Sequence, residues 1–330
     1  MQGKKTKIQT LVDTAPNLEI LNSFLVTEAK LQKSRKAVCS ISGGSDSDIV
    51  ADICANIDTE GKVTYVFFDT GLEFQATKAH LDDLENKYGI KIHREKAVKP
   101  IPLCCRQYGI PFLSKQVSEF IERLQRHNFD WSDRSFEELY AEYPNCKVAL
   151  KWWCNKWGEK SKFNIDYNKG LKQFMILNPP NFKISNKCCH FAKKLVAKKF
   201  KQKGGFDLSI QGVRKAEGGA RSSAYKNCFT PAKDNTIDEY RPVFWYKQDT
   251  KEAYKKQYNI TYSDCYEVWG LPRTGCSGCP YARDIDYELA AVEKYEPKLY
   301  KALIKVFGKS YEYTRRYKEF QVVQRNSATI

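Results

Sequence analysis

Short apolar runs alternate with helical patterns along the first hundred residues. Apolar runs at residues 36–41, 63–68 and 90–93 predict three strands, because short runs bounded by turn-forming residues are typical of buried strands. Residues 46–57 and 77–88 carry apolar side chains at helical spacing. Strands that alternate with helices in this way predict a parallel sheet with crossover helices. In such sheets ligands bind beyond the carboxyl ends of the strands.

The pattern is less regular beyond residue 100. Helical spacing returns at residues 114–127, 188–203 and 284–307, and residues 206–211 predict a further strand. Residues 128–184 show no clean periodicity. We therefore predict an α/β fold, a Rossmann-like parallel sheet with flanking helices, plus a helical, cysteine-containing C-terminal part. The expected domains are an α/β core at 1–127 and 204–250, a basic Trp- and Lys-rich insertion with a Cys-Cys helix at 128–203, and a CxxC-containing helical region at 251–330.

Composition narrows the class of protein. At 42% hydrophobic and 13% aromatic residues, the 330-residue chain has the material for a core, which excludes a largely disordered or collagen-like protein. The first ten residues lack the apolar segment of a signal peptide, and no run of about 18 apolar residues occurs. We therefore expect a soluble, cytoplasmic protein without a membrane partner; its oligomeric state is open.

The net charge of +16 indicates a polyanionic partner, and most of it is local. Residues 145–203 contain fifteen Lys, no Arg and two acids, so this segment carries +13. Trp152, Trp153 and Trp157 lie among these lysines and would offer stacking surfaces to DNA or RNA. A tryptophan core under a solvated helix face explains the same residues equally well. The lysines of 193–203 would otherwise balance nucleotide phosphates or an anionic cluster.

A glycine-rich loop directly after the first predicted strand is the strongest local motif. Its residues are Ser42, Gly43, Gly44, Ser45, Asp46 and Ser47. Two glycines let the backbone turn its N–H groups toward phosphate oxygens, and the following helix N-terminus adds positive potential. The loop therefore predicts a phosphate site, whereas the simpler interpretation is a Ser/Gly turn with a helix cap.

Twelve cysteines in a cytoplasmic protein indicate metal binding or chemistry rather than disulfides. The adjacent pair Cys188 and Cys189, with Cys276 and Cys279 of a CxxC motif, makes four thiolates. Such a set suits an iron–sulfur cluster or structural zinc, and unmetallated redox thiols are the remaining alternative. Cys228 or Cys265 could replace one member of the adjacent pair.

Several motifs resemble, in order, the PAPS reductase-like branch of the PP-loop ATP pyrophosphatase (adenine nucleotide alpha hydrolase) superfamily, which is related to DNA-phosphorothioation proteins and to PAPS reductase-like proteins of phages and mobile elements. The matching stretches are SGGSDS at 42–47, FFDTGLEF at 67–74, YGIPFLSKQVSEFI at 108–121, KCCHFAKK at 187–194, IQGVRKAEGGARSSAYKNC at 210–228, PVFWYKQD at 242–249 and LPRTGCSGCP at 271–280. The resemblance implies a nucleotide site, with Mg²⁺, and favours a [4Fe-4S] cluster over zinc.

The resemblance also implies roles for individual residues. The loop residues named above would bind the phosphates of ATP, or of APS or PAPS. Asp69, Thr70 and Glu73 would lie beside the nucleotide, where a carboxylate at a strand end suits Mg²⁺ or a ribose hydroxyl. Gly212, Arg214, Glu217 and Arg221 match a GxR..E...R pattern, and a guanidinium pairs with sulfate or phosphate oxygens in bidentate fashion. The expected catalytic residues are Asp46, Ser47, Arg214 and Arg221.

These features predict an ATP pyrophosphatase or adenylyltransferase-type enzyme of sulfur metabolism or sulfur modification, supplied by a sulfur donor such as a cysteine desulfurase. The main alternative is reduction of APS or PAPS to sulfite. Ser45 replaces the Lys common in ATP users, which weighs against ATP, whereas the final residues QRNSATI lack the cysteine of the reductase tail. A third alternative is a nucleic-acid-binding, phosphorothioation or defence-associated protein, for which DNA or RNA would be the partner.

Overall fold

The computed structural model describes residues 7–218, 224–234 and 236–327. The chain forms two compact units, and each is described by itself. The first unit combines Met1–Val98 with Lys193–Ser277, and the second combines Lys99–Ala192 with Gly278–Ile330. No helix in the described ranges is both long enough and apolar enough to span a lipid bilayer.

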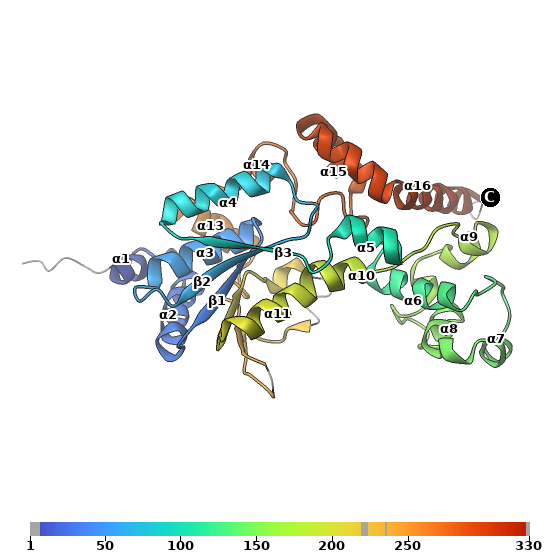
Figure 1. Ribbon diagram of the computed structural model, residues 1–330, viewed down its shortest axis with the longest axis horizontal. Helices are drawn as coiled ribbons and strands as arrows, with labels where there is room; N and C mark the ends of the chain where they lie inside the picture. Colours follow the sequence, from blue (N-terminus) through green and yellow to red (C-terminus); the bar gives the residue numbers. More distant parts are fainter. Residues whose placement is uncertain (1–6, 219–223, 235, 328–330) are drawn as a thin grey trace, which may run out of the picture. The chain divides into compact units, whose positions relative to one another are not determined.

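A six-stranded sheet organises the first unit, in the order β3-β2-β1-β4-β6-β5 (Figure 1). All neighbouring strands are parallel except β5 and β6, which are antiparallel. This confirms the predicted α/β, Rossmann-like fold. The strands are β1 (Ala37–Ile41), β2 (Val63–Asp69), β3 (Ile92–Lys96), β4 (Leu208–Gln211), β5 (Phe229–Thr230) and β6 (Asp238–Tyr240).

Helices pack on both faces of this sheet because its central strands are apolar on both sides (Figure 1). Cys39 and Tyr65 lie on the face that packs against α2, α3, α4 and α13, while Val38 and Val66 lie on the face that packs against Phe200 of α11. The helices of this unit are α1 (Lys7–Asp13), α2 (Leu18–Lys33), α3 (Ser45–Ile57), α4 (Gln75–Tyr88), α11 (Leu195–Gly204), α13 (Gln248–Gln257) and α14 (Asp264–Glu267).

The second unit is helical around an aromatic core. Trp152 and Trp153 are almost fully buried, and the indole N–H of Trp153 donates to the carbonyl of Ser132 at 3.0 Å. The suggestion that these two rings stack on nucleic acid is therefore wrong, because they form the core; Trp157 is 40% exposed. The helices are α5 (Ile101–Tyr108), α6 (Lys115–Arg126), α7 (Phe136–Glu142), α8 (Lys147–Trp153), α9 (Leu171–Leu177), α10 (Lys187–Cys189), α15 (Ile285–Tyr295) and α16 (Pro297–Ser327).

Some boundaries differ from the sequence expectations for identifiable reasons. The pattern at 284–307 is two helices rather than one, since α15 ends before Pro297. A π-helical turn, His190–Lys194, interrupts the helix expected at 188–203. The two units divide after Val98, Ala192 and Ser277, so α13 belongs to the first unit, where Tyr254 is buried in the sheet core and donates to Asp52 at 2.6 Å. The domain bounds expected from the sequence stay a prediction.

Candidate functional site

The glycine-rich loop lies where the sheet reverses its strand order. Strand β1 has β2 on one side and β4 on the other, so the loop that follows β1 opens at a topological switch point. Gly43 has a φ of +64°, and a Cβ there would approach the methyl group of Thr77 to 2.5 Å. The loop then enters α3 at Ser45. Position and conformation both fit the predicted phosphate-binding role.

Ser47 holds the loop in shape from within the first turn of α3. Its Oγ accepts hydrogen bonds from the backbone N–H groups of Ser42 at 3.1 Å and Gly44 at 3.2 Å, and donates to the carbonyl of Gly44 at 2.7 Å. The Ser42 hydroxyl lies 3.1 Å from the same oxygen. Ser47 therefore preorganises the loop, which is a positioning role rather than a free hydroxyl aimed at a ligand.

The segment after β4 packs directly on the loop because residue 212 is glycine. A Cβ on Gly212 would lie 2.7 Å from the backbone nitrogen of Ser47, a distance that real side chains do not adopt. This close approach places Arg214 beside Asp46, with Nε 2.8 Å from Oδ1. The structure thus brings together Gly212, Arg214 and the loop residues. Arg221 lies outside the described residues.

Lys251 of α13 is a site residue that the sequence analysis missed. Its side chain is only 9% exposed, and its ammonium lies 3.2 Å from Asp46 Oδ1 and 2.5 Å from Ser45 Oγ. The family resemblance implies a lysine at position 45 in ATP users; in this chain the residue is Ser45, and Lys251 brings an ammonium beside it from a distant helix. The serine at position 45, where the resemblance implies a lysine in ATP users, was the one observation in the sequence that could have prompted a search for a lysine elsewhere.

A pocket of about 80 Å³ lies in front of the loop. Arg214, Lys251 and Arg273 contribute positive charge to its lining, and Asp46 and Glu217 contribute negative charge. The other lining residues are Ser42, Gly44, Ser45, Ser47, Gly212, Tyr266, Pro272 and Thr274. Three cations, two carboxylates and the N-terminus of α3 make a site for an anionic group such as a phosphate or sulfate.

The acidic residues after β2 have local roles and do not line this pocket. Glu73 is buried and accepts hydrogen bonds from the backbone N–H of Thr70 at 3.2 Å and from its hydroxyl at 2.5 Å. Burial raises the pKa of Glu73, although the ammonium of Lys193 opposes this. Asp69 accepts from the N–H of Gly71 at 2.8 Å and lies 3.5 Å from Lys78. The structure therefore shows these side chains bracing the turn; their contact with a nucleotide stays a prediction.

A buried pair supports α3 below the loop. His80 Nε2 lies 2.9 Å from the carboxylate of Asp48, which is fully buried. Burial lowers the pKa of His80, but the hydrogen bond and charge of Asp48 raise it by more, so the net shift is upward. The pair therefore fixes α4 to the start of α3.

Four cysteines gather in the second unit, and one of them was not expected. The thiol of Cys188 hydrogen bonds with those of Cys105 and Cys189, and it interacts electrostatically with Cys279. The contact with Cys105 is the main cause that raises the pKa of Cys188. Cys105 belongs to the adjacent pair 104–105, for which the sequence analysis had no role, although a second Cys-Cys pair was a visible signal.

The turn that carries Cys279 is fixed within the same unit. Gly278 has a φ of +57°, its N–H donates to Glu288 at 2.7 Å, and its carbonyl accepts from the hydroxyl of Tyr311. Helices α15 and α16 thereby hold the turn at the start of the second unit.

Cys276 lies among residues of the first unit. Its thiol hydrogen bonds with Lys193 and Thr70 close to Glu73, and burial raises its pKa. Three of the four predicted ligands, Cys188, Cys189 and Cys279, thus interact with one another or with Cys105 in the second unit, and the contacts described for Cys276 are with residues of the first unit. Cys265, one of the alternatives, lies 3.9 Å from Thr77 in the first unit. Among the described residues no group of three or more His, Cys, Asp or Glu is arranged to hold a metal ion, so the ligand set stays a prediction.

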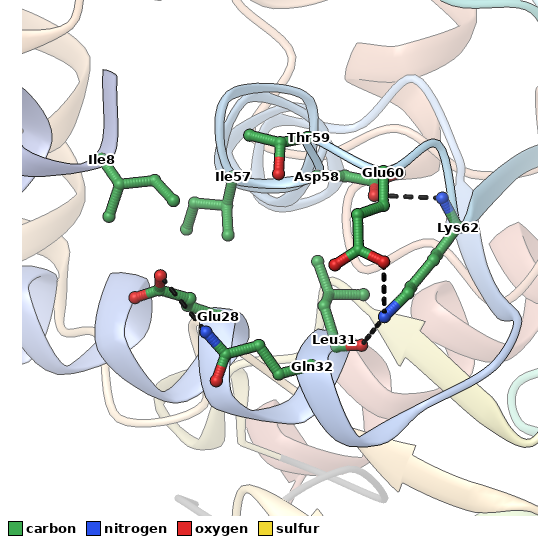
Figure 2. A pocket seen from close by; sticks show the side chains of 9 residues that line it. All are labelled: Ile8, Glu28, Leu31, Gln32, Ile57, Asp58, Thr59, Glu60 and Lys62. Carbon is green, nitrogen blue, oxygen red and sulfur yellow. Dashed lines mark hydrogen bonds and ion pairs between the residues drawn. The ribbon is translucent and has the colours of Figure 1, made fainter. Parts of the chain in front are cut away.

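Another pocket lies near the opposite ends of the strands (Figure 2). Figure 2 shows Lys62 reaching across it, with Nζ 3.1 Å from Glu60 Oε2 and 3.1 Å from the carbonyl of Leu31. Asp58 accepts from the backbone N–H of Lys62 at 3.0 Å. The polar groups of this pocket thus connect α2 to the turn before β2, and we assign the pocket a structural role.

Residues 36–111 match the family model of the phosphoadenosine phosphosulfate reductase domain, which confirms the expected resemblance for that part of the chain. An uncharacterized protein of Methanocaldococcus jannaschii is 38% identical over 82 residues, which is 24% of this chain and 16% of that protein. The matched stretch thus spans only a small part of that relative.

Three solved structures with a similar arrangement of elements are each 12% identical to this chain. They include a PAPS reductase from Candida auris in a phosphate complex (82% of this chain, 93% of that one, TM-score 0.44) and the U34-tRNA thiolase NcsA from Methanococcus maripaludis with its [4Fe-4S] cluster (90% and 80%, TM-score 0.36). An NH3-dependent NAD synthetase from Campylobacter jejuni covers 93% of this chain and 96% of its own, with a TM-score of 0.36. At these TM-scores the likenesses carry no conclusion about chemistry.

Proposed function

We propose that this protein is a nucleotide-using enzyme of sulfur chemistry that cleaves ATP between its α- and β-phosphates. The observation that carries the proposal is the cluster of Arg214 and Lys251 around Asp46, directly beside the glycine-rich loop. Lys251 supplies the cation that Ser45 does not, which removes the main objection from sequence to ATP as substrate. The family-model match over residues 36–111 supports the sulfur-related class.

The pocket residues have separable tasks in this reaction. The loop N–H groups and the α3 N-terminus would bind the β- and γ-phosphates, while Arg214 and Lys251 turn from Asp46 to the phosphate oxygens. Asp46 and Glu217, the carboxylates of the pocket, would hold Mg²⁺ against those oxygens. An acceptor oxygen attacks the α-phosphorus, the bond to the bridging oxygen breaks, and pyrophosphate leaves with both electrons. Catalysis then consists of positioning and charge neutralisation.

We propose a [4Fe-4S] cluster, held by cysteines of the second unit, as the sulfur-handling group. Cys105, Cys188, Cys189 and Cys279 provide four thiolates within one unit, which is the number such a cluster takes. When bound, the cluster would supply a place for sulfide or a route for electrons. A sulfur nucleophile could then displace AMP from the adenylated acceptor.

Reduction of APS or PAPS is the second candidate, and the description of the matching family model favours it. The same three cations would accept a sulfate group as readily as a phosphate. In that reaction a thiolate attacks the sulfur of the sulfonucleotide, the nucleotide leaves, and a second thiol releases sulfite as a disulfide forms.

The test compares the two products on one preparation. The full chain, purified without oxygen, is supplied with ATP and Mg²⁺ while pyrophosphate is measured, and separately with APS or PAPS and a thiol reductant while sulfite is measured. Pyrophosphate that depends on Lys251 and Arg214 is the expected result. Lys256→Gln, an exposed lysine on the same helix outside the pocket, is the matched control. Sulfite formation without pyrophosphate would overturn the proposal.

A further inference from the structure

The largest cavity among those described in the first unit lies away from the loop, between α11 and the β5–β6 hairpin. Its volume is about 720 Å³, which is within the range of small-molecule and cofactor sites. The residues that line it are Lys194, Ala197, Lys198, Lys201, Gln202, Gly205, Phe206, Thr230, Pro231, Lys233, Thr236, Ile237 and Glu239. We call it the α11 pocket.

The charge of the α11 pocket is strongly positive. Lys194, Lys198, Lys201 and Lys233 contribute four cations. Glu239 is the only acid of the lining, and Arg241 at 2.6 Å and Lys201 at 3.7 Å already neutralise it. The pocket therefore attracts a ligand with several negative charges.

The spacing of three of these lysines suits a ligand that carries several negative charges in a row. Lys194 ends the π-helical turn directly before α11, and Lys198 and Lys201 follow it at spacings of four and three residues, so the three form one stripe. At 1.5 Å per residue the stripe is about 10 Å long, roughly three nucleotides at the rise of one nucleic-acid strand. Between them the pocket is apolar, with Ala197, Phe206 and Ile237 in its wall. The lysine side chains of the α11 pocket suit the phosphates of a nucleic-acid strand, and its apolar wall suits one base that is not stacked on its neighbours.

We propose that the α11 pocket binds a single-stranded segment of nucleic acid, with its phosphodiesters on the lysine stripe and one base in the hollow. A peptide of acidic residues alone would use the lysines but has no planar apolar group for the hollow. The α11 pocket and the loop site lie at opposite ends of β4, since Phe206 of the α11 pocket precedes the strand and Gly212 of the loop site follows it. The four residues of β4 span about 13 Å.

Binding is measured without ATP, by fluorescence anisotropy of the full chain with RNA and DNA oligonucleotides of the same sequence. Four neutralised phosphates predict a slope of log affinity on log salt of about −2.8, so affinity falls about 50-fold from about 50 to about 200 mM salt. The variant Lys194→Gln/Lys198→Gln/Lys233→Gln should bring the slope to about −0.7. The matched control, with the same change in net charge, is Lys160→Gln/Lys162→Gln/Lys169→Gln, three exposed lysines of the second unit.

The proposal is supported if the pocket variant loses binding of either oligonucleotide and the control variant keeps it. Tighter binding of RNA or of DNA then identifies which nucleic acid the pocket prefers. Equal loss in both variants, no binding at low salt, or binding of polyglutamate alone overturns it. Lys251→Gln separates this proposal from the proposed function, since it should abolish pyrophosphate release and leave strand binding unchanged. Failure of the ATP assay would likewise leave the binding result intact.

Discussion

The role assigned to Lys251 can be tested by removing its charge and then supplying it from another position. Lys251→Met keeps the apolar stem, which packs in a site where the side chain is 9% exposed, and removes only the ammonium. In this variant Arg214 still pairs with Asp46 at 2.8 Å, so the Asp46 carboxylate keeps a cationic partner. We therefore expect a thermal unfolding temperature close to that of the natural protein.

The catalytic loss follows from the place of the ammonium. A preorganised donor in a partly buried site contributes about 3–4 kcal/mol to transition-state stabilisation, so kcat for pyrophosphate release should fall about 100- to 1000-fold. Ser45→Lys in a Lys251→Ala background should restore much of this, because Ser45 Oγ lies 2.5 Å from the natural ammonium and the shortened residue 251 leaves room. The assay is release of pyrophosphate from ATP at saturating Mg²⁺.

The reasoning would be refuted by a loss smaller than about threefold, which corresponds to less than about 1 kcal/mol. A large loss that Ser45→Lys does not reverse, in a variant that folds and binds ATP, would also refute it, because the charge itself would then not be what matters. Lys256→Gln controls for a general effect of charge on α13.

Three further changes test other parts of the structure. Gly212→Ala should destabilise the protein by about 1–3 kcal/mol and weaken nucleotide binding, because its Cβ would meet the backbone of α3, whereas Gly275→Ala, with open space around it, should not change the melting temperature. Cys105→Ser should lose the iron and sulfide of the anaerobically purified protein and Cys276→Ser should retain them; the reverse result would restore the ligand set implied by family resemblance. The raised pKa of His80 predicts a stability contribution that is present below about pH 6.5 and lost as pH rises through the folded pKa, measured by denaturant unfolding, and His80→Gln should remove this pH dependence.

Local patterns were sufficient for four strands of the sheet, β1 to β4, and for the loop, but not for the short strands β5 and β6. The alternation of apolar runs and helices is a property of neighbouring residues, and it placed the glycine-rich loop between β1 and α3, where the structure has it. The same reasoning could not find Lys251, because it reaches Asp46 from a helix two hundred residues further along the chain. Nor could it decide between a stacking surface and a core for Trp152, since burial depends on what packs against the ring.

The cysteines show a second limit of local patterns. Cys276 and Cys279 are three residues apart in a motif that usually presents both sulfurs to one metal, and their described neighbours differ: Lys193 and Thr70 for Cys276, and Cys188 for Cys279. The spacing of residues along the chain shows which side chains are able to come together. The packing of α5 against α10 decides that Cys105 contacts Cys188.

Both edges of the sheet are built to resist pairing with another sheet. At one edge, β3 exposes four consecutive polar side chains, His93, Arg94, Glu95 and Lys96, and at the other, β5 is only two residues long and runs antiparallel to its neighbour. Charged or very short edge strands are how natural proteins prevent edge-to-edge aggregation. Self-association of this chain, where it occurs, should therefore involve helical or loop surfaces, and the sheet should not grow from one molecule into the next.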